Sequence, residues 1–144
     1  MRCGWARNVV PNNPSPRLVV VIVVWRRTHD GVEWLVLHRS HFAPQFGGDW
    51  AWTPPSGVLD EGESEAGGAW RELREETGLE QACVRTPCGD GAIVVFHAEV
   101  DRDAEVRLSA EHDAYRWLPL DEARALCLPA YVGDQLACVA ALAG

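Results

Sequence analysis

Residues 57–79 read GVLDEGESEAGGAWRELREETGL, a segment in which glutamates recur at helical spacing beside two arginines. Glu72, Glu75 and Glu76 fall within roughly a 100° arc of such a helix, because positions three and four apart are neighbours. Like charges this close repel, and a divalent cation held by carboxylate oxygens would relieve the repulsion. Oxygen ligands suit Mg²⁺ or Mn²⁺, so the segment predicts a site for one of these ions.

The helix is expected to run from about Ser64 to Thr77. Gly78 lies where a left-handed residue ends a helix, and acidic residues lie at the positive end of the helix dipole. A second stripe follows the i, i+3, i+4, i+7 pattern, is apolar, and is expected to face a core. It consists of Ala66, Ala69, Trp70 and Leu73.

The same segment resembles the Nudix box, G-x5-E-x7-R-E-U-x-E-E-x-G-U with U aliphatic, at every fixed position. The family places a Trp-containing strand ending in Pro-x-Gly before the box, and residues 50–57 read WAWTPPSG. The chain is therefore identified as a member of the Nudix hydrolase family (MutT-like). The resemblance implies an α/β fold of the Nudix type, an α/β/α sandwich with a mixed β-sheet between helices.

The resemblance also implies an activity, the metal-dependent hydrolysis of a diphosphate bond by water attacking phosphorus, which is a pyrophosphohydrolase reaction. The implied partner is a small-molecule nucleoside diphosphate derivative, in which a nucleoside diphosphate is linked to another group. Carboxylate-held Mg²⁺ or Mn²⁺ fits that chemistry, because it can bridge substrate phosphates and orient water. The implied metal ligands are the backbone carbonyl of Gly57 and the carboxylates of Glu72, Glu75, Glu76 and Glu111. The implied catalytic residues are Glu75, Glu76, Glu111 and Arg71, with Glu63 as a supporting acid that holds Arg71.

Glu111 is assigned from a segment outside the box. Residues 109–117 read SAEHDAYRW and resemble the Glu-His segment that precedes a Trp-containing strand in nucleotide-cleaving members. Glu111 would then act as a metal ligand or general base, and its alternative is a solvated loop acid. His112 titrates in a useful range, but a lone loop histidine is more often structural, so it ranks below Glu111 as the base.

The candidates for substrate binding are one arginine and several aromatic residues. Arg39 ends the second expected strand, where related enzymes often place an arginine on substrate phosphates, although a surface arginine on an edge strand is the alternative. Trp50 and Phe46 are the candidates for stacking on a base, while Trp52 and Trp70 are expected in the core. Phe96 matches an aromatic position of the diadenosine tetraphosphate hydrolases.

Subfamily markers leave the substrate open between a (d)NTP and a diadenosine polyphosphate. The ADP-ribose enzymes carry a proline near residues 94–96, where this chain has VVF, and only a fragment of the coenzyme A motif is present. The diadenosine tetraphosphate hydrolases have WTPPKG before the box, whereas residues 52–57 read WTPPSG and lack the lysine. Hydrolysis of ADP-ribose or a nucleotide sugar, a non-catalytic nucleotide-binding regulator and an isoprenoid diphosphate isomerase are further alternatives.

Whole-chain properties bound these expectations. At 144 residues, the chain is expected to form a flexible arm over residues 1–16 and a single Nudix domain over residues 17–144. The net charge of −8 argues against a nucleic-acid polymer as partner, and the apolar run at residues 18–25 is too short for a membrane span. A cytoplasmic protein with five reduced cysteines is expected. A homodimer, with Trp5 of the arm at its interface, stays open.

The remaining elements are expected from alternation and turn residues. Residues 18–25 form a continuous β-branched run, which is typical of a strand buried on both faces. Residues 34–39 are expected to pair with this strand in a hairpin, because a polar turn containing Asp30-Gly31 separates the two runs. Further strands are expected at residues 50–53, 82–86, 92–101 and 115–118, and helices at residues 121–126 and 131–142.

Overall fold

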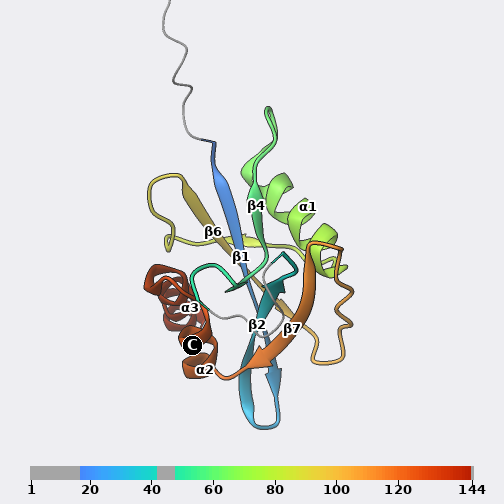
Figure 1. Ribbon diagram of the computed structural model, residues 1–144, viewed down its shortest axis with the longest axis vertical. Coiled ribbons are helices and arrows are strands. Elements are labelled where there is room, and N and C mark those ends of the chain that lie inside the picture. The colour runs from blue at the N-terminus through green and yellow to red at the C-terminus, as the bar shows by residue number, and fades with distance from the viewer. Residues whose placement is uncertain (1–16, 42–47, 144) are drawn as a thin grey trace, which may run out of the picture.

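The computed structural model describes residues 17–41 and 48–143, so the expected arm and the stacking candidate Phe46 lie outside the described residues. The described residues form one seven-stranded sheet with three helices (Figure 1). The strands are β1 (Val19–Thr28), β2 (Gly31–Arg39), β3 (Trp52–Thr53), β4 (Ser56–Val58), β5 (Val84–Arg85), β6 (Ile93–Val100) and β7 (His112–Leu118), and the helices are α1 (Glu65–Thr77), α2 (Leu120–Leu126) and α3 (Ala130–Ala143).

The sheet is mixed, with β1 at its centre. β1 pairs in parallel with β6 and antiparallel with β2, which confirms the expected hairpin. β4 also pairs with β1, whereas β3 and β7 both pair with β2. The continuous β-branched run of β1 forms such a strand because both of its faces are covered, and its residues from Val20 to Val24 are buried.

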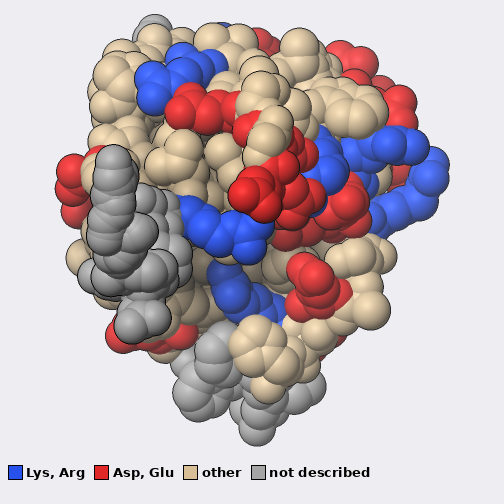
Figure 2. All heavy atoms as spheres, turned by 90° about the horizontal axis from the view of Figure 1, so that it is seen from above, with Lys and Arg blue, Asp and Glu red and all other residues tan. Residues whose placement is uncertain are grey.

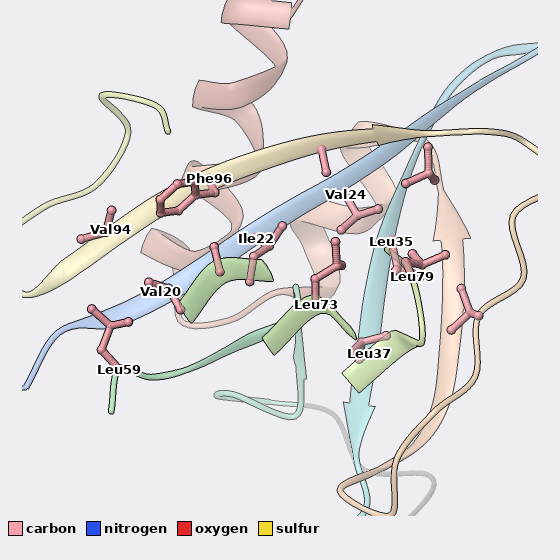
Figure 3. Packing of buried hydrophobic residues seen from close by; sticks show 14 residues of the cluster. Val20, Ile22, Val24, Leu35, Leu37, Leu59, Leu73, Leu79, Val94 and Phe96 are labelled. Atoms are coloured by element: carbon pink, nitrogen blue, oxygen red, sulfur yellow. The ribbon is translucent and has the colours of Figure 1, made fainter. Parts of the chain in front are cut away.

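Helices cover the two faces of the sheet separately. Helix α1 packs on one face, where Leu73 meets Ile22 of β1 and Leu37 of β2 in a continuous apolar cluster (Figure 3). Helices α2 and α3 cover the other face, where Leu136 packs with Val23 (Figure 1). The α/β/α arrangement with a mixed sheet is therefore confirmed. Among the described residues, no helix combines the length and apolar character of a membrane span.

Helix α1 begins and ends where the sequence predicts. The Ser64 hydroxyl accepts a hydrogen bond from the backbone N–H of Gly67 at 3.0 Å, which caps the first turn. Gly78 adopts φ 73°, and its N–H donates to the carbonyl of Arg74. These caps satisfy backbone groups that a helix end would otherwise leave without partners.

The expected apolar stripe of α1 is only half right. Ala69 and Leu73 are buried, but Ala66 is exposed, and Trp70 is 42% exposed beneath the guanidinium of Arg74. The face of α1 that is buried includes two acids of the box, Glu72 and Glu76. It comprises Gly68, Ala69, Glu72, Leu73, Glu76 and Thr77.

Gly68 gives a physical reason for this rotation. A Cβ atom at this position would overlap the Leu59 side chain, so only a glycine allows α1 to lie this close to the chain that follows β4. The close approach turns the helix face that carries Gly68 and Glu72 inward and leaves Trp70 outside. A helix-weakening residue is therefore retained here for packing.

Two cysteines depart from the expected reduced state. Cys88, in the loop between β5 and β6, is disulfide-bonded to Cys138 of α3, with 5.9 Å between their Cα atoms. Cys83 and Cys127 are free thiols, as expected. The bonded pair is 50 positions apart in sequence. It lacks any local spacing signal, because only the packing of α3 against the sheet brings the two thiols together.

We expect the double variant Cys88→Ser/Cys138→Ser to unfold at lower denaturant concentration than the wild type, by about 2–4 kcal/mol in the free energy of unfolding. The physical reason is that the cross-link restricts the unfolded chain. Urea titration under non-reducing conditions measures the difference, and Cys83→Ser serves as the control with little expected change. Identical stability of the oxidised wild type and the double variant would contradict the prediction.

Candidate active site

The glycine and two glutamates of the box meet at the junction of β4 and α1. Glu76 accepts a hydrogen bond at 3.1 Å from the backbone N–H of Ser56, which directly precedes Gly57. A Cβ atom at Gly57 would overlap the carboxylate of Glu72, so only a glycine leaves room for that carboxylate. Gly57, Glu72 and Glu76 therefore form one compact group, as the resemblance implied.

Burial sets the electrostatics of the two glutamates. Glu72 is 8% exposed and Glu76 4% exposed, and their carboxyl groups hydrogen-bond each other. Burial, together with the charges of Glu72 and Glu111, raises the pKa of Glu76 to about 8, although the hydrogen bond from the Ser56 N–H opposes the rise. Burial also raises the pKa of Glu72. The pair thus retains a proton near neutral pH, in a place where a cation would be strongly favoured.

A divalent cation fits this group, because its charge would replace the shared proton and its oxygen-only donors suit Mg²⁺ or Mn²⁺. Glu75 lies outside the group, with its side chain 58% exposed and ion-paired to Arg71 at 3.1 Å. Within the described ranges, no three Asp, Glu, His or Cys side chains are already grouped as a metal site. The ligand role of Glu75 therefore stays a prediction, and it requires the ion pair to open.

Arg71 connects the acids of this region. Its Nε lies 2.6 Å from Oε2 of Glu63 and its Nη2 lies 2.9 Å from Oε1, a bidentate pair. Its Nη1 also lies 3.3 Å from Glu72. Figure 2 shows acidic and basic side chains in close contact on the face seen from above. Arg71 is thus placed to position Glu72, while Glu63 fixes Arg71.

The Arg71 guanidinium lowers the pKa of Glu63 to about 2, and the N–H of Asp60 assists it. Because its pKa is lower in the folded than in the unfolded state, the Glu63 carboxylate stabilises the folded protein above the unfolded pKa of about 4.5. This stabilisation is lost as the pH falls toward about 2. We expect Glu63→Gln to be less stable than the wild type at neutral pH and to converge with it in acid. Melting temperature against pH measures this, with Glu80→Gln as control, and parallel curves would contradict it.

A cavity of about 380 Å³ brings the predicted outer acid to the box. Glu111 and Glu76 both line it, together with Arg39 and His112. The segment before β7 is held to β2 by the N–H of Ser40, which donates to the carbonyl of Glu111 at 2.9 Å. Glu111 is exposed, but it lines the same cavity as the buried Glu76, so its role as a metal ligand or general base stays a prediction.

His112 and Arg39 contribute unpaired nitrogen atoms to this region. Nδ1 of His112 and Nε of Arg39 are buried without hydrogen-bond partners among the described residues. Burial, with Arg39 nearby, lowers the pKa of His112, so its ring is neutral at pH 7. β2 is flanked by β1 on one side and by β3 and β7 on the other, so Arg39 is no edge-strand residue. A bound anion would supply the acceptor that Arg39 lacks.

A second cavity of about 210 Å³ shares two residues, Arg39 and Ser56, with the first. At its border, Nε1 of Trp50 donates to the hydroxyl of Tyr131 at 3.1 Å, and both residues are nearly half exposed. Trp50 adopts φ 61°, which is rare for a bulky residue and shows that its surroundings hold it in place. Trp50 thus borders a cavity, and its role in stacking on a base stays a prediction.

Trp52 and Phe96 are both core residues. Trp52 is 6% exposed and packs against His38, as expected. Phe96 was predicted to contact substrate, but it is 2% exposed within the apolar cluster beneath α1 (Figure 3). The prediction is wrong because β6 lies beside β1, with Phe96 opposite Ile22, so its side chain is covered by the helix layer.

Sequence reasoning missed three residues of the second cavity, namely Thr53, Tyr131 and Gln135. Thr53 lies in the strand before the box, in which only the tryptophans were considered as candidates for the site. Tyr131 and Gln135 are one helical turn apart in α3, a spacing that places them on one face. That spacing was the available signal, but it indicates a shared face and does not say that the face borders a cavity.

The comparisons agree with the fold and identify the family. Residues 15–136 match the NUDIX domain family, so the chain belongs to that family and is a Nudix hydrolase. It is 40% identical over 105 residues to an asymmetrical bis(5'-nucleosyl)-tetraphosphatase of Rattus norvegicus, covering 64% of this chain and 67% of the relative. The corresponding protein of Sus scrofa is 36% identical over 121 residues, covering 71% and 78%.

Among solved structures, the fold is similar to that of an Ap4A hydrolase from Caenorhabditis elegans in a binary complex. The TM-score is 0.72 at 26% sequence identity, and the match covers 89% of this chain and 98% of the other. A second structure of the C. elegans Ap4A hydrolase matches with a TM-score of 0.66. The same class of protein thus appears among the relatives found by sequence and by structure.

Proposed function

We propose that the chain is a metal-dependent hydrolase of dinucleoside tetraphosphates, diadenosine tetraphosphate in particular, that cleaves its substrate asymmetrically. The observation that carries the proposal is the pair of adjoining cavities. One is lined by Glu76 and Glu111, the other is largely apolar with an aromatic border, and Arg39 belongs to both. Two relatives at 36–40% identity are named asymmetrical bis(5'-nucleosyl)-tetraphosphatases, which supports the same substrate class.

The chain's own residues divide the work as follows. Gly57, Glu72 and Glu76, joined by Glu75 and Glu111, would hold Mg²⁺ or Mn²⁺. Such an ion supplies charge neutralisation for phosphate oxygens and lowers the pKa of water. Arg71 keeps Glu72 in place, and second contacts of this kind govern ligand orientation. Glu111, which faces the first cavity beside Glu76, accepts the proton of the attacking water.

Arg39 binds the phosphate chain in this proposal. Ser56 stands at the position where the hydrolases that this chain resembles carry lysine in WTPPKG. Arg39 is then the only arginine among the described residues that line the two cavities. Its buried, unpaired Nε would gain a phosphate oxygen as acceptor, and its planar fork suits bidentate contact. Arginine on β2 would thus replace lysine before the box.

We expect Arg39→Ala to raise KM for the dinucleotide about 10- to 100-fold, the size of a lost charge-assisted hydrogen bond. The melting temperature should not fall, because the substitution also removes a buried nitrogen without a partner. Steady-state kinetics and thermal unfolding measure both effects, and Arg27→Ala, at an exposed position, is the control. Unchanged KM would remove Arg39 from the substrate site.

The function itself is tested by product-resolved hydrolysis with Mg²⁺ or Mn²⁺. Diadenosine tetraphosphate, (d)NTPs, ADP-ribose, nucleotide sugars and coenzyme A are offered in parallel. The expected products from diadenosine tetraphosphate are ATP and AMP, formed only with metal. Two molecules of ADP, or preferred cleavage of another compound, would contradict the proposal. Tight nucleotide binding without any turnover would favour a regulatory binding domain.

A further inference from the structure

The second cavity is lined by two largely buried polar side chains. Thr53 is 5% exposed, and its Oγ1 is buried without a hydrogen-bond partner among the described residues. Gln135 is 8% exposed and lines the same cavity. A buried polar group without a partner costs free energy, so the retention of Thr53 points to a ligand that enters this cavity, where it would also meet the Gln135 amide.

The rest of the cavity is lined largely by apolar and aromatic side chains. Val19, Val21 and Ile93 of the central strands line it, and the linked side chains of Trp50 and Tyr131 border it. This cavity adjoins the first cavity at Arg39 and Ser56, which line both. A nucleoside whose phosphates lie at Arg39 would therefore place its base here.

We propose that Gln135 is a specificity-determining residue that binds the amino group and N7 of an adenine base in this cavity. This inference rests on the proposed function, since it concerns one nucleoside of the same substrate. The side-chain amide offers a donor and an acceptor side by side, which matches the N6 amino donor and N7 acceptor of adenine. Guanine presents two acceptors, O6 and N7, along that edge, and would leave the amide oxygen unpaired.

Thr53 adds a second polar contact to the same base or its ribose. Its hydroxyl is both donor and acceptor, so it can pair with either kind of group and contributes less to the choice between bases. Gln135 is held by α3, in which Tyr131 lies one turn earlier and Cys138 about one turn later. The disulfide of Cys138 with Cys88 links α3 to the loop before β6, so the helix that carries the Gln135 amide is covalently held against the sheet.

Two substitutions at Gln135 test the proposal through the ratio of kcat/KM for diadenosine tetraphosphate to that for diguanosine tetraphosphate. The wild type should favour adenine by about 10- to 100-fold. Gln135→Leu, similar in size, should abolish most of that preference. Gln135→Glu should favour guanine, because a guanine turned to present its Watson–Crick edge offers two donors, N1–H and the amino group, to the carboxylate, whereas adenine offers a single donor in either orientation. Gln81→Glu, at an exposed position, is the matched control.

Binding of AMP and GMP by calorimetry separates this inference from the proposed function. If AMP binds better than GMP and Gln135→Glu reverses the order, the inference holds even where no dinucleotide is cleaved. If diadenosine tetraphosphate is cleaved but the two base preferences are equal in the wild type and both variants, the inference is overturned while the proposed function stands. Melting temperatures within a few degrees of the wild type show that the variants are folded.

Discussion

Glu76→Gln is expected to make the metal-free protein more stable while removing its hydrolytic activity. Burial raises the pKa of Glu76 to about 8 from an ordinary 4.5, so the folded state disfavours the charged carboxylate. Between these pH values the unfolded chain is ionised and the folded chain is protonated, so the group costs stability that grows as pH rises above about 4.5. Glutamine does not ionise and has no such cost. We therefore expect the variant to gain about 1–3 kcal/mol in the free energy of unfolding at neutral pH.

The same substitution removes a proposed metal ligand. Activity should fall by about 10³-fold or more, because water activation and charge neutralisation both depend on the ion. Mg²⁺ should raise the melting temperature of the wild type but not that of the variant. Glu75→Gln is the control for the stability gain, since its carboxylate is largely exposed. Equal metal stabilisation of wild type and Glu76→Gln would show that Glu76 is not a ligand.

Gly57→Ala is expected to lower kcat about 100-fold with a small change in stability. The added methyl group would overlap the carboxylate of Glu72, which must then move away from Glu76. Displacing a ligand by a short distance costs catalysis heavily, because the geometry of the reacting groups is disturbed. Steady-state kinetics at saturating metal, together with thermal unfolding, measures the two effects separately.

Gly67→Ala is the matched control for Gly57→Ala, because Gly67 lies on the exposed side of α1 and an added Cβ would meet only the capping hydroxyl of Ser64, at 2.9 Å, which an exposed serine side chain can relieve by a small shift. The alanine improves helix propensity by up to about 1 kcal/mol, which offsets the disturbed cap, so activity should be preserved with little change in stability. If both variants kept full activity, Glu72 would have no need of its present position, and the proposed metal site would be wrong.

Much of the fold and the central group of the site could be predicted from local patterns. The caps at Ser64 and Gly78, the burial of β1 and the hairpin with β2 all follow from neighbouring residues. The approach of Glu72 to Glu76 follows from helical periodicity alone, since the two residues are one turn apart. Arg71 and Glu63 were predicted as partners from the box resemblance, and the structure pairs them.

Other features could not be predicted, because they depend on which layer each side chain meets. Trp70 was expected inside and Phe96 at the substrate, and the structure reverses both. Helical spacing marks an apolar stripe but not its rotation, which Gly68 and Leu59 set here by close contact. Strand position likewise does not say that a helix covers a given side chain.

The sequence by itself determined the family, the box helix and the acids that converge on its buried face, because these depend on periodicity and capping over a few turns. Only the tertiary structure decided the disulfide between Cys88 and Cys138 and the cavity that Gln135 shares with Trp50. Those contacts join segments far apart in the chain. They arise from the packing of α3 on the sheet, and no local pattern encodes that packing.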